Sequence, residues 1–194
     1  ATPGVVAAAQ ALLESLSPAQ REQMLFAVDD TEWRNWANVH RFVRQGVAVA
    51  DMNAPQREAA YALLQAGLSA KGYATARDIM RLNHHLAELV ANFDEYGEHL
   101  YWFTIMGTPS DSEPWGWQVD GHHLVVNYFV LGDQVVMTPT FMGSEPVRAE
   151  SGDYAGTEIM QSHQDSALAF MQSLTDRQRA AAVLDSNKGR GNVA

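Results

Sequence analysis

The spacing of apolar residues changes from helical to strand-like at the segment DEYGEH (residues 94–99). Before this segment, apolar residues recur every three or four positions, which is the period of amphipathic helices. After it come three runs rich in aromatic and β-branched residues, which favour strands. Helical spacing returns over residues 157–184. The pattern predicts an α+β fold that is mainly helical, with a small antiparallel β-meander of about three strands packed against helices.

Three predicted helices begin with a capping box, a polar N-cap residue followed three positions later by glutamine. The pairs are Ser17 with Gln20, Asn53 with Gln56, and Thr175 with Gln178. The stretches LLESLSPAQR and FMQSLTDRQR, which contain the first and third of these starts, are similar to each other. We interpret the similarity as a recurring hairpin of short helices rather than a solenoid.

The chain length of 194 residues fits a single domain with a sizeable core. We expect one α+β domain over residues 1–184, helical over 1–93, with the β-meander over 98–142 and helices again over 157–184. The tail, residues 185–194, is polar and contains glycine, so we expect it to be flexible.

The composition excludes several classes of function. A net charge of −10 and a pI near 5.0 argue against a nucleic-acid partner, since phosphate binding needs clustered lysine and arginine. The absence of cysteine rules out disulfides, thiolate catalysis and zinc–thiolate sites. No apolar run reaches the roughly 18 residues of a membrane span, and no basic amphipathic stretch indicates membrane binding. The first residues, ATPGVV, lack a methionine, as after removal of an export signal, so localisation stays open with export favoured.

The longest predicted helix spans residues 69–93 and contains two adjacent histidines. Its apolar residues form one stripe at three- and four-residue spacing, made of Ile79, Leu82, Leu86, Leu89 and Phe93. At about 100° per residue, His84 lies opposite this stripe and His85 on its flank. We therefore expect a solvated His84 and a partly buried His85, which do not bind one metal ion together.

The segment WQVDGHHLVVNYFVL (residues 117–131) is predicted to be one central strand. Apolar residues at both odd- and even-numbered positions indicate a strand that is covered on both faces, with Val125 and Val126 buried on opposite sides. Because side chains alternate along a strand, His122 and His123 would point in opposite directions unless Gly121 introduces a bulge.

A two-residue turn at positions 132–133 sets the register of the next strand. Counting back from it places His122 opposite Gly143 and Asp120 opposite Glu145. A histidine between two carboxylates could act as general acid and base, or bind a divalent metal. The predicted catalytic residues are His122, His123, Asp120 and Glu145, with His122 and His123 as metal ligands and a divalent metal as candidate cofactor. Packed structural histidines, a metal site and a metal-free polar site all stay open as interpretations.

Trp115 and Trp117 follow a proline-containing loop and are two positions apart. On a strand both rings project from one face, where they could form a platform for a small-molecule ligand. Burial of both rings as anchors of the loop explains the same pattern. Tyr101, on the first predicted strand, and His85, on the long helix, complete the set of candidate ligand-binding residues.

The segment GTPSDSEPWGWQVDGHHLVVNYFVLGDQVVMTPTFMGSEP resembles the domain of unknown function 3500 (DUF3500) family of bacterial and fungal proteins. The resemblance extends over about residues 53–184 and includes GYATARDIMRLNHHL, DYAGT and SLTDRQR. It implies a largely helical domain with a small central sheet, often in exported proteins, and it carries over no catalytic role. Members of the family continue beyond the point where GRGNVA ends this chain. The resemblance therefore implies that a C-terminal portion is missing and that the chain associates with it.

Two functions from different classes remain open. The first is an enzyme, a hydrolase or lyase acting on a small polar substrate through the histidine–carboxylate cluster of the central hairpin, with a divalent metal if one is bound. The second is a non-catalytic exported module that binds a ligand or partner through Trp115 and Trp117. An enzyme requires polar groups with perturbed pKa values that converge in a cleft, whereas a binding module requires exposed aromatic surface. The concentration of polar residues at one end of an apolar hairpin favours the enzyme.

Overall fold

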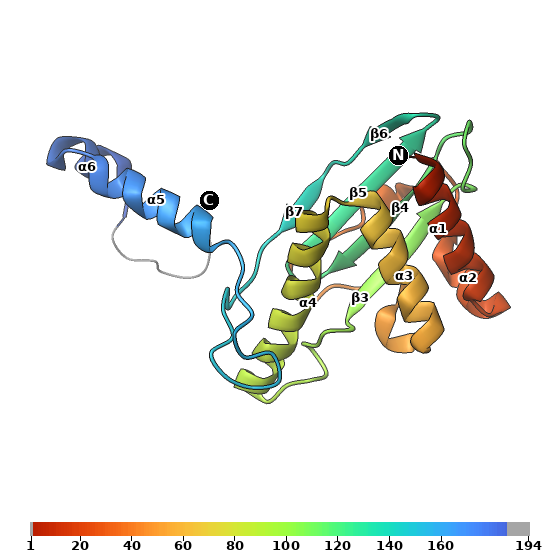
Figure 1. Cartoon of the computed structure of the whole chain (residues 1–194), viewed down its shortest axis with the longest axis horizontal. Coiled ribbons are helices and arrows are strands. Elements are labelled where there is room, and N and C mark those ends of the chain that lie inside the picture. Colours follow the sequence, from red (N-terminus) through yellow and green to blue (C-terminus); the bar gives the residue numbers. More distant parts are fainter. Residues whose placement is uncertain (1, 186–194) are drawn as a thin grey trace. The chain divides into compact units, whose positions relative to one another are not determined.

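The computed structural model describes residues 2–185, which form two compact units, one ending at Ile159 and one beginning at Met160 (Figure 1). The fold is α+β, as predicted, but the mixed sheet has seven strands instead of about three. The helices of the first unit are α1 (Thr2–Ser15), α2 (Pro18–Met24), α3 (Ala54–Gly67) and α4 (Ala70–Val90), with two 3-10 helices, η1 (Thr31–Arg34) and η2 (Val49–Asp51). The strands are β1 (Leu25–Phe26), β2 (Val47–Ala48), β3 (Tyr101–Met106), β4 (Trp115–Gly121), β5 (Leu124–Leu131), β6 (Gln134–Val136) and β7 (Thr140–Met142).

The second unit contains α5 (Gln161–Ser173) and α6 (Asp176–Ala182). All three predicted capping boxes are formed, at the starts of α2, α3 and α6. The flexible tail predicted over residues 185–194 lies, from residue 186 onward, outside the described residues. Among residues 2–185, no helix is both long and apolar enough to cross a membrane.

The sheet has the strand order β1-β3-β4-β5-β6, with β2 added to the edge of β3 and β7 added to β5. β1 pairs in parallel with β3, and the other pairs are antiparallel. The short strands β1 and β2 fall in the region predicted to be helical. Two residues each are too few for a periodic pattern to show in the sequence.

The predicted single strand over residues 117–131 is wrong, because it is a hairpin of two strands. β4 ends at Gly121, β5 begins at Leu124, and these two residues pair with each other. His122 and His123 form the turn between them, and His123 has a φ of 59° in the left-handed region. Residue propensities do not indicate this turn, because aromatic and β-branched residues on both sides favour a continuous strand. Histidine is also not a typical turn residue.

The predicted pairing of the next strand is correct near its turn and wrong further along. Leu131 pairs with Gln134, as expected. Beyond β6 the register shifts by one residue, so that Leu124 pairs with Met142. The placement of Asp120 opposite Glu145 is also wrong, because Asp120 belongs to β4 and pairs with Val125 of β5.

Helices cover one face of the sheet (Figure 1). The largest fully buried aromatic side chains belong to β3 and β4 and are Trp115, Trp117, Tyr101 and Phe103. Trp117 stacks on Tyr128 of β5 with ring centroids 5.1 Å apart. A Cβ atom added to Gly67, the last residue of α3, would lie 2.6 Å from the Trp117 ring. Val125 and Val126 are both buried, as predicted for a strand covered on both sides.

The opposite face of the sheet is covered by residues 27–46, which we call the crossing segment. Gly116 alternates with the two tryptophans of β4, so it faces this side, and a Cβ atom added to it would lie 2.6 Å from the Trp33 ring. Nearer the other end of β4, Arg44 of the crossing segment forms an ion pair with Asp120. The two faces thus differ in chemistry, one apolar and helical, the other carrying buried polar groups.

The predicted apolar stripe of α4 is buried only in its first half. Ile79 and Leu82 are buried, whereas Leu89 and Phe93 are exposed. His85 is buried, in line with its predicted place on the flank. The solvated position predicted for His84 is wrong, because its ring lies 5.3 Å from the rings of Phe93 and Tyr154 and is half-buried between them. Contacts from the loop after β7 cannot be anticipated from the helical period of α4.

Gly116 offers a test of the close packing between the sheet and the crossing segment. We expect Gly116→Ala to lower the free energy of unfolding by roughly 1–3 kcal/mol, because the new Cβ atom would lie 2.3 Å from the backbone oxygen of Tyr128. Gly4→Ala is the matched control, since nothing lies within 4 Å of the added atom and alanine favours a helix by up to about 1 kcal/mol. Urea denaturation of both variants measures the difference, and equal stability would contradict the described packing.

Candidate functional site

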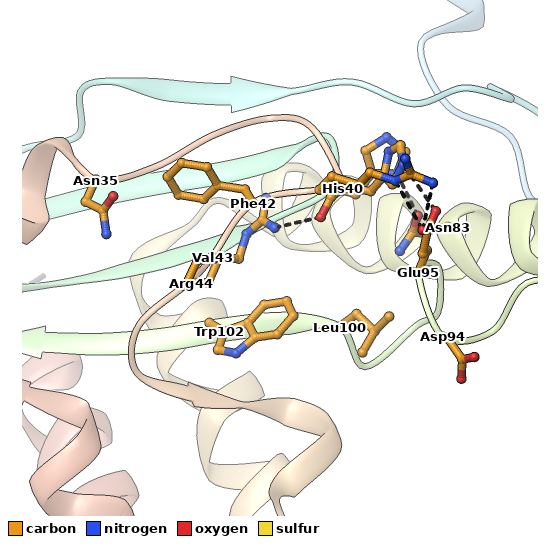
Figure 2. Close-up of a pocket in the computed structure, with 12 residues that line it drawn as sticks. Asn35, His40, Phe42, Val43, Arg44, Asn83, Asp94, Glu95, Leu100 and Trp102 are labelled. Carbon is orange, nitrogen blue, oxygen red and sulfur yellow. Dashed lines mark hydrogen bonds and ion pairs between the residues drawn. The ribbon is translucent and has the colours of Figure 1, made fainter.

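An open cavity of about 650 Å³ lies at the end of the sheet where the crossing segment meets the β4–β5 turn. Its lining comes from the crossing segment, from α4, from the chain between α4 and β3, from β3 itself and from the turn. These residues are Asn35, His40, Arg41, Phe42, Val43, Arg44, Asn83, Asp94, Glu95, Leu100, Trp102 and His122. Figure 2 shows the aromatic ring of Trp102 facing the crossing segment across the cavity.

Arg44 is the buried centre of one wall. Its side chain is 2% exposed, and its guanidinium carbon lies 5.5 Å from the ring centroids of both Phe42 and Trp102. Nη2 donates hydrogen bonds to the backbone oxygens of Ala37 and Val39, at 2.6 and 2.7 Å. One side chain therefore fixes the path of the crossing segment from within, as guanidinium groups with several donors can do.

Asp120 lies behind Arg44, with Oδ1 3.2 Å from Arg44 Nε. Burial raises the pKa of Asp120 to about 6, although the charge of Arg44 opposes the shift. Glu32 adds a smaller rise in the same direction, and the pKa of Glu32 is itself raised by burial. Burial thus opposes ionisation of both carboxyl groups, and Arg44 offsets part of this effect for Asp120.

His122 has a defined tautomer. The amide nitrogen of Asn83 donates to the backbone oxygen of Gly97 at 2.9 Å, so the amide oxygen of Asn83 is left to accept. This oxygen lies 2.8 Å from His122 Nδ1, which must therefore carry the proton. Burial and the positive groups nearby hold the pKa of His122 at about 3. The ring is neutral near pH 7, and its Nε2 has a free lone pair.

His40 is the second imidazole of the cavity, with its ring centroid 5.4 Å from that of His122. His40 Nε2 lies 3.4 Å from a carboxylate oxygen of Glu95 and 3.2 Å from the hydroxyl oxygen of Tyr96. Arg41 holds the other oxygen of Glu95 at 2.9 Å. The cavity therefore brings a neutral histidine next to a histidine that has a carboxylate partner.

His123 does not point away from His122, because the turn brings the two rings into a stack with centroids 4.0 Å apart. The backbone N–H of His123 donates to Asn38 of the crossing segment, and its backbone oxygen accepts from Gly143 after β7, both at 2.9 Å. Burial lowers the pKa of His123, while the charge of Glu145 opposes this shift. Of the four predicted catalytic residues, the structure thus groups three near the turn, and Glu145 acts on His123 from the surface.

The candidate ligand-binding residues lie inside the core. Trp115 and Trp117 are completely buried, and Trp115 Nε1 donates to the backbone oxygen of Ser110 in the preceding loop. Tyr101 is also buried, and its hydroxyl donates to the backbone oxygen of His122 at 3.0 Å. His85 donates from Nδ1 to Glu88. These contacts correspond to the alternative interpretation of the two tryptophans, in which they anchor the loop. Neither tryptophan ring is exposed for contact with a ligand.

The model of the family described as protein of unknown function (DUF3500) matches residues 1–193, nearly the whole chain. The chain belongs to this family. Comparisons with curated proteins and with solved structures give no match. The DUF3500 match extends over the crossing segment, which lies before the region in which the sequence resemblance was noticed.

A metal ion has little support at the His122–His123 turn of this DUF3500 chain. Within residues 2–185, three metal-binding side chains converge at His84, Glu88 and Asp153, and at no other place. The stacked histidines of the turn therefore have no third ligand in reach. Two of the interpretations fit this geometry, packed structural histidines and a metal-free polar site.

Several cavity residues escaped the sequence analysis, above all His40, Arg44, Asn83 and Glu95. The crossing segment has neither helical nor strand periodicity, and the prediction of helices over residues 1–93 is wrong here, because residues 27–46 contain only the 3-10 helix η1 within irregular chain. A signal was present all the same, because a connection of about twenty residues with little regular structure is uncommon in a compact domain unless it is functional. The position of the crossing segment therefore makes its histidine, arginines and aromatic residues candidates for the site. The residues with which they interact could not be identified in the same way.

The ion pair between Arg44 and Asp120 can be tested by removing one partner and then both. We expect Arg44→Met to lower the free energy of unfolding by about 3 kcal/mol at pH 8, because it leaves a buried carboxylate without its counter-charge. The double variant Arg44→Met/Asp120→Leu should recover part of this loss. Denaturant titration measures both, and a double variant no more stable than the single one would contradict the expected cause.

The same pair has a pH dependence with a defined sign. The pKa of Asp120 is raised from 3.8 to about 6 in the folded state, so its stabilising contribution is complete below about pH 4 and is lost as the pH rises through about 6. The loss caused by Arg44→Met should therefore be smaller at pH 5 than at pH 8.

The protonation state of His122 can be measured directly. We expect long-range ¹⁵N–¹H spectra to show the neutral Nδ1–H tautomer from pH 8 down to pH 5, because the ring is held to Asn83 and its pKa is about 3. An unstructured peptide with the sequence around His122 serves as control and should titrate near about 6.5. In Asn83→Leu the tautomer should no longer be fixed. A wild-type ring that gains a proton above pH 5 would contradict this assignment.

Proposed function

We propose that this chain is an enzyme, a hydrolase or lyase that acts on a small polar substrate in the cavity beside the β4–β5 turn. The observation that carries the proposal is the pair of histidines with different environments, His122 and His40, at the border of one open cavity. Two groups of one chemical type with different hydrogen-bond and charge partners are typical of acid–base sites. The size of the cavity lies within the usual range of small-molecule sites.

His122 takes the accepting role in this proposal. Its Nδ1–H is held by Asn83, so its Nε2 lone pair can accept a hydrogen bond from a substrate hydroxyl or from an attacking water. Since its pKa of about 3 reflects burial and positive neighbours, proton transfer to Nε2 becomes favourable when negative charge arrives with the substrate or develops on it. This requirement favours substrates with an acidic group or an anionic intermediate.

His40 takes the donating role. Glu95 and Tyr96 both contact its Nε2, and Glu95 is in turn held by Arg41. A protonated His40 forms an ion pair with Glu95 and can give its proton to a leaving group. Trp102 and the neighbouring Leu100 supply an apolar wall, which strengthens the interactions of the polar groups by excluding water.

Asp120 acts through Arg44 rather than on the substrate. Asp120 is buried and absent from the lining of the cavity, whereas Arg44 lines it. We therefore assign Asp120 a positioning role, since its charge keeps Arg44 and, through Arg44, the backbone around His40 in place. Arg44 Nη1 donates to the backbone oxygen of His40 at 3.3 Å, which supports this assignment.

A non-catalytic binding module is the second candidate, and one observation favours it. Each histidine of the cavity has a partner of its own, His122 with Asn83 and His40 with Glu95, as expected for structural residues. The aromatic contact in this case comes from Trp102, since the two tryptophans of β4 are buried. Such a module binds a small polar molecule without turnover.

Kinetics on the isolated chain separate the two candidates. The substrates are small 4-nitrophenyl esters, phosphates and glycosides for the hydrolase, and short 3-hydroxy acids, followed by the ultraviolet absorbance of the unsaturated product, for the lyase. We expect turnover by the wild-type chain, with kcat/KM reduced about 100-fold or more in both His122→Ala and His40→Ala, the range for loss of a general acid or base.

His163→Ala is the matched control for these substitutions. His163 is an exposed histidine of α5, in the other unit of the chain, so its removal should leave kcat/KM unchanged. Equal rates in His122→Ala and in the control would rule out the assigned role of His122. Saturable ligand binding without turnover would instead support the binding module.

A further inference from the structure

A second group of ionisable side chains lies on the part of α4 that carries the adjacent histidines. We infer that His84, Glu88 and Asp153 bind a divalent transition-metal ion, of the kind represented by Zn²⁺ and Mn²⁺. His84 and Glu88 are four residues apart on α4, and Asp153 comes from the loop after β7. Each offers one ligand atom, and these atoms all lie within 4.8 Å of one another.

The distances are close to those of a coordination sphere. His84 Nε2 lies 3.6 Å from Asp153 Oδ2 and 3.9 Å from Glu88 Oε1. Ligands bound to one metal at about 2.0–2.2 Å lie roughly 3.0–3.5 Å from each other. A contraction of a few tenths of an ångström brings the His84 nitrogen to such a distance from each carboxylate, and the two carboxylate oxygens lie within 4.8 Å of each other. Residues at i and i+4 of a helix lie on the same face and can share a metal without any change of backbone.

The backbone of the loop is fitted to Glu88. The N–H of Asp153 donates to Glu88 Oε1 at 3.0 Å, which brings the two carboxylates together. Gly152 has a φ of 76°, and a Cβ atom added to it would lie 1.9 Å from Glu88 Oε2. Another residue at position 152 would be strained at this φ and would displace the Glu88 carboxylate. The glycine thus permits the approach of two negatively charged groups that repel each other unless a cation lies between them.

Two further contacts orient the ligands. His85 Nδ1 donates to Glu88 Oε2 at 3.1 Å, in the manner of partners that orient a ligating carboxylate. The His84 ring is held between Phe93 and Tyr154, with centroids 5.3 Å from each.

The ligand set indicates the kind of metal. One imidazole nitrogen with two carboxylates suits Zn²⁺ or Mn²⁺, whereas Mg²⁺ and Ca²⁺ prefer oxygen ligands throughout. The exposed position of Asp153 leaves part of the coordination sphere open to water. With the ion bound, the loop would be tied to α4. This inference is independent of the proposed function, because it concerns none of the residues assigned to catalysis.

Zinc titration of the whole chain tests the site. The protein is prepared without a histidine tag, dialysed against chelator and titrated with ZnCl₂, and in a second series with MnCl₂, in a calorimeter. We expect one ion per wild-type chain and an affinity at least tenfold weaker in His84→Ala and in Asp153→Asn. Asp153 is 80% exposed, so Asp153→Asn should keep its fold, which circular dichroism checks.

Three control variants locate the ion. Glu150→Gln removes an exposed acid of the same loop, His163→Ala an exposed histidine elsewhere, and His122→Ala a ring of the cavity, and all three should bind Zn²⁺ like the wild type. Wild-type affinity in His84→Ala or in Asp153→Asn would overturn the inference. So would loss of binding in His122→Ala alone, or failure of the wild-type chain to bind either metal at millimolar concentration.

Discussion

The ion pair between Arg44 and Asp120 is the interaction on which the described site depends. It joins a segment without periodic structure to the central strand of a sheet, where burial removes the water that would otherwise solvate both charges. Arg44 also gathers the backbone of residues 37–40 around its guanidinium group. Without this pair, the sheet would still have its helical layer, but His40 would lose its fixed distance to His122. The ion pair therefore shapes the cavity without itself having to contact a ligand.

The β4–β5 turn has a comparable role on the other side of the cavity. The left-handed conformation of His123 closes the hairpin and stacks its ring on His122. Tyr101 of β3 and Asn83 of α4 then hold the backbone and the ring of His122 from two different layers of the fold. A side chain in a turn is usually mobile, yet this one is fixed by the core beneath it, as a site on rigid elements requires.

The features predictable from the sequence were those with a local cause. The capping boxes, the change from helical to strand spacing and the buried positions of Val125 and Val126 all follow from short-range patterns. The cavity borders the end of the central hairpin where the sequence analysis placed its candidate residues, because Asp120 and His122 are adjacent in the sequence to the turn that forms it. The partners of these residues were missed, since Arg44 and Asn83 lie far away along the chain and depend on packing. The pairing of Asp120 with Glu145 failed because the turn at His122 and His123 puts Asp120 on β4, where it pairs with Val125.

The different chemistry of the two sheet faces has a consequence for local opening. The apolar layer under α3 joins large buried surfaces, so it separates only when the whole unit unfolds. The crossing segment joins the sheet through ladder bonds near its two ends, at β1 and β2, and between them through the Trp33 ring and a few polar contacts. Such a segment detaches at a lower free energy than the strands beneath it and exchanges its amide hydrogens sooner. Access to the buried charges can therefore be gained by a movement that leaves the core of the molecule intact.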